Sequence, residues 1–158
     1  MLVVASITIV KNYYNDERNV YIAFFSLFDS SYEMKDVAFV SSVSSCGVEP
    51  DHLVGASSSL FKEFYSANSD QAKPDDISSF SSMVNVVNFK DTLRLHEVGI
   101  ENISSDKNIV QISRIGFNVE KDLALICMES SFSASIYMFE KVNAREWELS
   151  EHRNLWAI

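Results

Sequence analysis

The sequence has few of the residues that build phosphate and metal sites. Its 158 residues contain four glycines, all separated from one another, so no glycine-rich loop is present to surround a nucleotide phosphate. It contains only two cysteines, Cys46 and Cys127, and neither has a CxxC neighbour or a nearby histidine at metal-ligand spacing. These shortages disfavour a P-loop, a dinucleotide-binding fold and a cysteine-based metal site, and no cofactor is expected.

The two cysteines leave the redox compartment open. Cys127 lies in the apolar run Leu125–Met128, which favours a buried free thiol. A single disulfide between Cys46 and Cys127 is the alternative if the protein is exported, because disulfides persist in oxidising compartments.

Positive charge is also scarce. The chain has 13 lysine and arginine residues against 22 aspartate and glutamate residues, which gives a formal net charge of −9 at pH 7. Affinity for a phosphate backbone comes from lysine and arginine displacing counterions, so nucleic acid is not an expected partner. The acidic surface fits a well-solvated protein or one that meets a basic partner.

No hydrophobic run is long enough to cross a membrane. The apolar stretch Leu2–Val10 is nine residues long, about half of the roughly 20 that a spanning helix needs. No basic residue precedes it, and no clear cleavage site follows it. We expect residues 1–15 to be an export-signal remnant or an extra strand, with a slight preference for the former and hence for a periplasmic or secreted protein over a cytoplasmic one. Residues 1–158 are predicted to form a single domain.

Two apolar-striped segments are predicted to be helices. Val20–Phe28 carries apolar residues at three- and four-residue spacing, which predicts a largely buried helix capped by Asp16, with a strand as the competing interpretation. A second helix is predicted to open at Pro50-Asp51 and to end at Asn68. Its apolar stripe comprises Leu53, Ala56, Leu60 and Phe64. Between and after these helices, 36–43 and 83–87 are predicted strands and 66–82 a long loop.

The last third of the chain has the pattern of an antiparallel meander. Four β-rich runs are separated by brief polar turns. Val110 and Ile112 stand at even positions and Ile115 and Phe117 at odd positions, so in a regular strand the two pairs would point to opposite faces of the sheet. We therefore expect a bulge or bend near Ser113-Arg114. The second and third runs are apolar on both parities, which predicts central strands covered on both faces. The runs are Asn108–Asn118, Asp122–Ser130, Ser133–Lys141 and Arg145–Leu149.

These elements predict an α+β fold, with two N-terminal helices packed on a curved antiparallel sheet whose C-terminal part is a four-stranded meander. We expect both helices to keep one side of the sheet dry. A sheet curved around a helix, as in nuclear-transport-factor-2-like (NTF2-like) or cystatin-like folds, satisfies the same patterns by analogy of fold alone.

The segment Ser113–Asn118, of sequence SRIGFN, resembles a family of uncharacterised, mostly exported bacterial proteins. In that family an SRxGFN segment precedes an ALV-type strand, a tyrosine-containing strand that ends in a charged pair, and a tryptophan. The resemblance covers residues 50–150 and implies an exported sheet domain without an established activity. The chain departs from the family where Ser130–Ser133 replaces a glycine-rich turn, and again in the glycine-free turn before the tryptophan. The other matching residues are Phe64, Asn68, Ala124-Leu125-Ile126, Tyr137, Glu140-Lys141 and Trp147.

Arg114, Asn118 and Tyr137 are the candidate ligand-binding residues. Arg114 is a permanent charge within a β-rich run, so it must reach solvent, pair with a carboxylate or face a polar cavity. The favoured interpretation is that Arg114 lies on a solvated face and pairs with a carboxylate. The more specific alternative is that Arg114, Asn118 and Tyr137 line a concave pocket for an anionic ligand. Asn118 is more economically explained as a turn residue.

No catalytic or metal-binding residue is predicted. The histidines His52, His96 and His152 are scattered and none pairs at four-residue spacing, while no serine lies in a GxSxG elbow. The preferred hypothesis is therefore a small, non-enzymatic binding or interaction module of the bacterial envelope or secreted space, with an unknown protein or small ligand as partner. The alternatives are an acidic inhibitor or immunity-type protein for a basic partner, and an enzyme with a carboxylate or histidine in a cone-shaped pocket.

Overall fold

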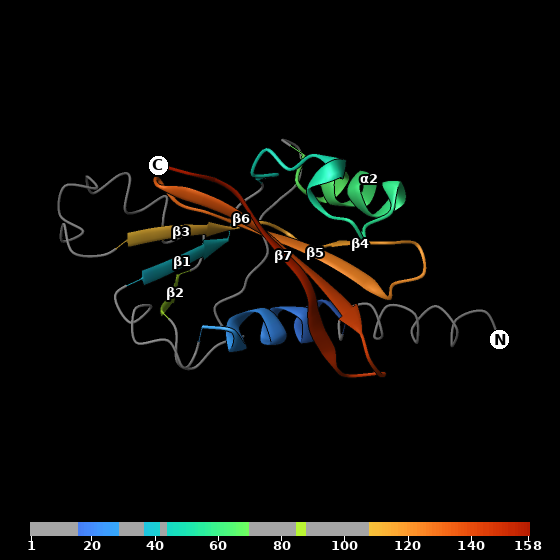
Figure 1. The fold of residues 1–158 in the computed structure, drawn as a ribbon. Helices are drawn as coiled ribbons and strands as arrows, with labels where there is room; N and C mark the ends of the chain where they lie inside the picture. The colour runs from blue at the N-terminus through green and yellow to red at the C-terminus, as the bar shows by residue number, and fades with distance from the viewer. Residues whose placement is uncertain (1–15, 29–36, 42–43, 70–84, 88–107) are drawn as a thin grey trace.

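The computed structural model describes residues 16–28, 37–41, 44–69, 85–87 and 108–158, and its central element is a seven-stranded sheet (Figure 1). The strands follow the order β2-β1-β3-β5-β6-β7, while β4 pairs with β5 beside this path. The strands are β1 (Val37–Ser41), β2 (Asn85–Val87), β3 (Asn108–Ile112), β4 (Gly116–Phe117), β5 (Leu123–Glu129), β6 (Ser133–Lys141) and β7 (Trp147–Ala157).

The fold is α+β, and the C-terminal part of the sheet is an antiparallel meander, as predicted. The strands from β3 to β7 pair antiparallel, whereas β1 pairs in parallel with both β2 and β3. The predicted strands over 36–43 and 83–87 are present as β1 and β2. The last strand is longer than predicted, because β7 continues beyond Leu149 to Ala157.

Of the two α-helices among the described residues, one lies on each face of the sheet (Figure 1), so the expectation that both helices cover the same side is wrong. The helix over residues 16–26 packs its aromatic side chains, among them Phe24, against Ala124 and Ile126. The helix α2 (Ser58–Ala67) packs Leu60, Phe61 and Phe64 against the next residues along β5, Leu125 and Cys127. Successive strand residues point to opposite faces, which is why β5 is apolar on both parities.

The second helical segment is shorter than predicted. Pro50–His52 forms a single 3-10 turn, η2, after which the backbone at Leu53 is extended, with φ −127° and ψ 124°. The α-helix begins only at Ser58, where Ser57 is the N-cap and its hydroxyl accepts a hydrogen bond from the amide of Leu60 at 3.3 Å. Tertiary contacts explain the break, because Leu53 is buried and the next two amides bind β7.

Asp16 does not have the predicted capping position, since it already lies within the helix. Its buried carboxylate instead accepts a hydrogen bond from the ammonium group of Lys141 at 2.7 Å, which fixes this helix to the end of β6. Among the described residues, no helix has the length and apolar character needed to cross a membrane. The predicted N-terminal segment 1–15, most of the predicted loop 66–82 and His96 lie outside the described residues.

A disulfide joins the first half of the chain to the meander. Cys46 and Cys127 are bonded, with their Cα atoms 6.2 Å apart and a sequence separation of 81 residues. The favoured prediction of a free thiol at Cys127 is therefore wrong, and the alternative of a single disulfide is confirmed. Both residues are buried against α2 and β6.

Candidate functional site

The predicted bend at Ser113-Arg114 is confirmed and is held by the serine side chain. The amide of Ser113 donates to the carbonyl of Cys127 at 3.0 Å, while its hydroxyl accepts from the amide of Cys127 at 2.9 Å. The same hydroxyl donates to the carbonyl of Arg114 at 2.9 Å. The side chain thus replaces a backbone partner in the ladder. Ile112 before the bend and Ile115 after it consequently lie in one core cluster.

Asn68 binds the backbone of Arg114 on both sides. Its side-chain oxygen accepts from the amide of Arg114 at 2.8 Å, and its side-chain nitrogen donates to the carbonyl of Arg114 at 3.0 Å. The nitrogen also donates to the carbonyl of Phe64, so the C-cap of α2 is fastened to the bend. Arg114 itself is half-buried. What this arrangement uses is the arginine backbone, which any residue except proline supplies.

Gly116 allows α2 to approach the sheet. A Cβ atom added there would lie 2.3 Å from the Cα atom of Phe64, well inside contact distance. The segment Ser113–Asn118 and the helix end Phe64–Asn68 are therefore two halves of one packing arrangement. Their physical role accounts for much of the motif that carries the family resemblance.

Asn118 is a turn residue, in agreement with the more economical interpretation. Its side-chain oxygen accepts from the amides of Asp122 and Leu123, at 3.0 and 2.9 Å. Its side-chain nitrogen donates to the carboxylates of Glu120 and Asp122, at 3.1 and 2.6 Å. Since the oxygen and both donor hydrogens of the amide are used within the turn, this side chain holds the β4–β5 connection.

Tyr137 belongs to the aromatic core beside the helix over residues 16–26. Its ring meets Phe24 edge-on at 5.2 Å between centroids and stacks on His152 of β7 at 4.5 Å. Burial raises the pKa of the Tyr137 phenol to about 12, and a hydrogen bond with Ser135 opposes this shift only partly. The side chain of Asn118 thus holds a turn, whereas that of Tyr137 packs in the aromatic core. A shared ligand pocket for Arg114, Asn118 and Tyr137 stays a prediction.

A different region combines rigid attachment with exposure: the segment over residues 44–57, which we call the anchored loop. The Cys46–Cys127 disulfide fixes its start, and the hydroxyl of Ser44 donates to the carboxylate of Glu129 at 2.8 Å. The hydroxyl of Tyr65 on α2 donates to the carbonyl of Val48. These partners lie on β5 and α2, so three attachments already hold the loop to the face that α2 covers.

A fourth attachment comes from β7. The two carboxylate oxygens of Glu151 accept hydrogen bonds from the successive amides of Val54 and Gly55, each at 3.3 Å. Burial of Glu151 opposes ionisation, but the hydrogen bonds from Gly55 and Val54 and the nearby Arg153 guanidinium outweigh it and lower the pKa of Glu151. The carboxylate is therefore charged at neutral pH and binds the loop in that form.

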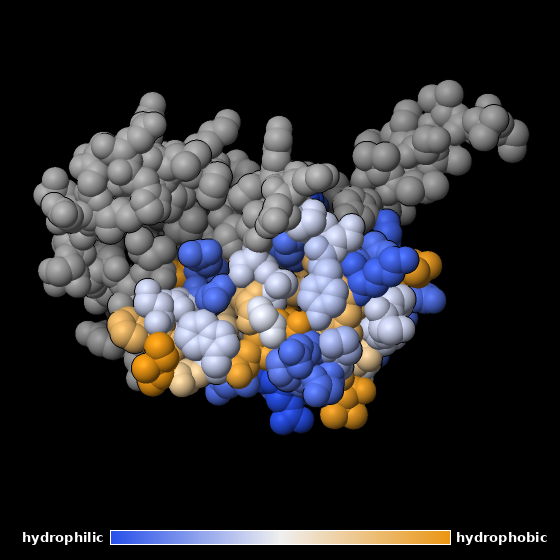
Figure 2. All heavy atoms as spheres, turned by 90° about the horizontal axis from the view of Figure 1, so that it is seen from above, coloured by the Kyte–Doolittle hydropathy of each residue, from blue (hydrophilic) through white to orange (hydrophobic). Residues whose placement is uncertain are grey.

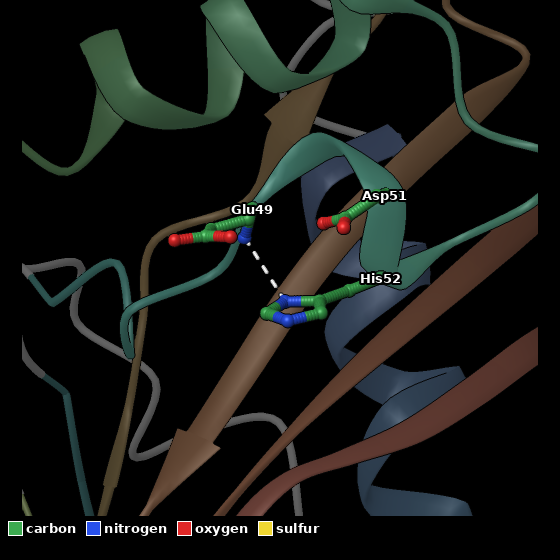
Figure 3. Close-up of side chains that lie close together, drawn as sticks. All are labelled: Glu49, Asp51 and His52. Carbon is green, nitrogen blue, oxygen red and sulfur yellow. Dashed lines mark hydrogen bonds between the residues drawn. The ribbon is translucent and has the colours of Figure 1, made fainter.

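The tip of the anchored loop carries Glu49, Asp51 and His52, whose ligand atoms all lie within 4.8 Å of one another (Figure 3). The amide of Glu49 donates to Nδ1 of His52 at 3.0 Å, and Figure 3 shows this bond closing the turn. A neutral imidazole that accepts at Nδ1 carries its proton on Nε2. Metal coordination at either nitrogen would require loss of that bond or of that proton, so this geometry is that of a cap on η2.

The exposed side chains around the tip are a mixture of acidic and apolar groups. Glu49, Pro50 and Asp51 are exposed, and Val54 is 88% exposed. Figure 2 looks onto the side of the molecule that α2 covers, where hydrophilic residues lie between separate hydrophobic ones among the residues drawn in colour. Sequence patterns do not reveal this region because three of its attachments join residues 81 or more positions apart.

Comparison of the chain with protein-family models, with curated proteins and with solved structures finds no match. The resemblance to an exported bacterial family and the nuclear-transport-factor-2-like or cystatin-like analogy therefore stay predictions.

Proposed function

We propose that this chain is an exported, non-enzymatic binding module that meets a basic protein partner through the exposed tip of the anchored loop. Export is supported by the Cys46–Cys127 disulfide, because disulfides persist in oxidising compartments and are rare in the cytosol of most organisms. The disulfide is also well protected, since Cys46 is 4% exposed and Cys127 is fully buried.

The observation that carries the proposal is the contrast between the fixed backbone of the anchored loop and its exposed side chains. Four long-range attachments restrain the loop, yet Glu49, Asp51 and Val54 face solvent. Binding residues are often found on loops held by a rigid scaffold. A loop that is ordered in advance loses less conformational entropy when a partner binds, so affinity per contact is higher.

Charge defines the chemistry of the partner. Glu49 and Asp51 are acidic and exposed, and the whole chain has a formal net charge of −9. A basic partner surface would be attracted at long range, and exposed charges of this kind act mainly on the association rate and its salt dependence. Val54 adds an apolar side chain beside the acidic pair. An inhibitor or immunity-type role is the form of this function in which the basic partner is an enzyme or toxin.

The polar groups of the SRIGFN segment support a scaffold role. The hydroxyl of Ser113, the amide side chain of Asn118 and the backbone of Arg114 all hold the chain together. Groups that are committed to internal hydrogen bonds are poor candidates for proton transfer to a substrate.

Site-specific photo-crosslinking tests the proposal. A photoreactive amino acid replaces Val54 at the loop tip or, as the matched control, Val142 in the β6–β7 turn, which is 54% exposed. We expect one basic protein of the extracytoplasmic fraction to be captured from position 54 and not from position 142. Equal capture from both positions, or capture of no basic protein from position 54, would contradict the proposal.

The captured partner then allows a quantitative test of charge. The double variant Glu49→Lys/Asp51→Lys should slow association by at least tenfold, an estimate of order of magnitude for loss of electrostatic steering. Glu140→Lys/Glu148→Lys makes the same change in net charge at an exposed cross-strand pair of β6 and β7, and should have a much smaller effect. If the two doubles slow association equally, only net charge matters and the loop tip is not the contact site.

A further inference from the structure

The strand β7 is the last strand in the order of the described sheet and the longest of its described strands. All eleven residues of Trp147–Ala157 are extended, and β6 is the only described strand that pairs with β7. Trp147 is buried and Glu151 and Leu155 are half-buried, while the other residues of β7 are exposed. An edge of this length presents a row of backbone donors and acceptors to any strand that aligns with it.

The charges on β7 complement one another when two copies of the strand are aligned antiparallel. Full overlap of Trp147–Ala157 with itself places the two-fold axis at His152, the middle residue of the strand. Within one chain, Nε of Arg153 already lies 3.3 Å from a carboxylate oxygen of Glu151. In this register Glu151 also lies opposite Arg153 of the second copy, and Arg153 opposite Glu151 of the second copy, so the two intrachain pairs would join into one group of four alternating charges. Opposed charges on neighbouring strands stabilise a pair, whereas like charges destabilise it.

The neighbouring registers lack this complementarity. An axis at Glu151 would place two glutamates opposite each other, and an axis at Arg153 would do the same with two arginines. The side chains of Glu151 and Arg153 also share a face, since their partners in β6 are Met138 and Ile136, which both lie in the α2-side core cluster. Of the three registers with an axis at Glu151, His152 or Arg153, the one centred on His152 therefore has the best charge pairing.

Two bulges interrupt β7 and define where regular pairing is available. Ser150 and Leu155 have no partner in β6, and between them Glu151–Asn154 pair regularly with β6. Bulges commonly shield sheet edges from pairing along their whole length. Here they leave a regular segment that contains His152 and both charged residues of the complementary pair.

We infer that two copies of this chain associate through their β7 strands, antiparallel about a two-fold axis at His152, with Glu151 and Arg153 paired between the copies. A closed two-fold contact of this kind is isologous, so the same strand serves both copies. The two seven-stranded sheets would join into one continuous sheet. The contact between copies does not require the proposed basic partner, although Glu151 also holds the anchored loop through the amides of Val54 and Gly55.

Cysteine crosslinking tests the register in the full-length chain. Directly opposed residues on antiparallel strands have Cβ atoms about 4.5–5.5 Å apart, close to the separation that a disulfide spans. In the variant His152→Cys the new thiols of two copies face each other at the axis. We expect rapid formation of a covalent dimer under mild oxidation, read on a non-reducing gel.

The variant Glu148→Cys is the matched control, because it is an exposed position on the same strand. In the inferred register its two copies are eight residue steps apart, or about 26 Å, so it should crosslink at least tenfold more slowly. Sedimentation of the unmodified chain should show a monomer–dimer equilibrium across concentration.

Charge reversal provides an independent measurement. Arg153→Glu converts both intermolecular pairs to like charges and should weaken the dimer by about tenfold. It also removes the contact of Arg153 with Glu151 in the same chain, so the cysteine crosslinking decides the register. Arg145→Glu makes the same charge change in the exposed turn before β7 and should leave the dimer unchanged. The inference would be overturned by a chain that sediments as a monomer at all concentrations, or by equal crosslinking at positions 148 and 152. A monomeric chain whose β7 pairs with a peptide of another protein would give the first of these results.

Discussion

Substitution of Gly116 by alanine tests the contact between α2 and the sheet. The new Cβ atom would lie 2.3 Å from the Cα, 2.6 Å from the Cβ and 2.7 Å from the backbone nitrogen of Phe64. Carbon atoms in ordinary contact are about 3.5 Å apart or more, so α2 would have to move outward by about 1 Å. Because two of these atoms are backbone, no change of rotamer can relieve the clash.

The expected cost follows from what moves with Phe64. Leu60, Phe61 and Phe64 are all buried by at least 99%, and the Asn68–Arg114 hydrogen bonds begin at the end of the same helix. Overpacking of a core that cannot relax locally costs about 1–3 kcal/mol, and loss of helix contacts adds to it. We expect Gly116→Ala to lower the free energy of unfolding by about 3 kcal/mol.

Two other glycines provide matched controls for the same chemical change. At Gly55 the added Cβ would meet the flexible end of Met138, at 2.9 Å, so Gly55→Ala should be nearly neutral. At Gly47 the space is open but φ is +68°, so Gly47→Ala should cost about 1 kcal/mol through backbone strain alone. Urea denaturation of the three variants with the disulfide intact measures the series. If Gly116→Ala falls within about 0.5 kcal/mol of Gly55→Ala, the close approach of α2 to β4 is refuted.

Three further predictions concern the disulfide and two ionisable groups. Replacing Cys46 and Cys127 together by alanine should lower the free energy of unfolding by about 4.5 kcal/mol, the loop-closure value for a separation of 81 residues; in the unmodified chain, alkylation after denaturation without reductant should label no thiol, and labelling would show that the bond is absent. The pKa of Tyr137 is raised to about 12, so the folded state keeps a proton that the unfolded state releases above about pH 10. The free energy of unfolding should therefore fall by about 2–3 kcal/mol between pH 10 and 12. This contribution to the pH dependence should vanish in Tyr137→Phe. The pKa of Glu151 is lowered, so its contribution to the free energy of unfolding is present above the unfolded pKa and is lost as pH falls through the folded pKa. Glu151→Gln should therefore make stability depend less on pH on the acid side. An unchanged acid side would exclude the contacts of Glu151 with Val54 and Gly55 as a source of that pH dependence.

The meander can be predicted because its signals are local. Its polar turns and its alternation of apolar residues depend on neighbours a few positions away. The change of parity between Ile112 and Ile115 also locates the bend correctly, because an uninterrupted strand cannot move its apolar residues from one face to the other. The end of β7 is not predicted, since Ser150–Ala157 is mostly polar and an edge strand with two exposed sides has no clear periodic signal.

The placement of the helices cannot be predicted from their own sequences. An apolar stripe shows that a helix packs against something, but it does not show which face of the sheet it covers. A usable signal lies in the sheet instead. The neighbouring residues Leu125 and Ile126 of β5 are both apolar and point to opposite faces, so each face of the sheet needs a layer that covers it. The anchored loop and the disulfide leave no such trace, because their contacts depend on the finished fold. The two strands β1 and β2 are predicted, but their parallel pairing is not.

The candidate ligand residues show why a sequence motif can be recognised although the structural role of its residues is not. The turn role of Asn118 is predictable, since asparagine is favoured there. The pairing of Asn68 with the backbone of Arg114 has no sequence signal beyond the presence of an asparagine at a helix end. The role of Gly116 depends on Phe64, which lies 52 positions earlier in the chain. Such long-range packing is what single-sequence patterns do not contain.

The lone bridge between Cys46 and Cys127 has a consequence for biogenesis. With two cysteines among these 158 residues, only one connectivity exists within them, so their oxidation to an intramolecular bridge cannot produce a scrambled isomer. Simple oxidation of the two thiols is therefore sufficient to form the bridge, and no isomerisation of disulfides is needed. During synthesis Cys127 is added 81 residues after Cys46. The bridge between them can therefore close only late in translation or after it.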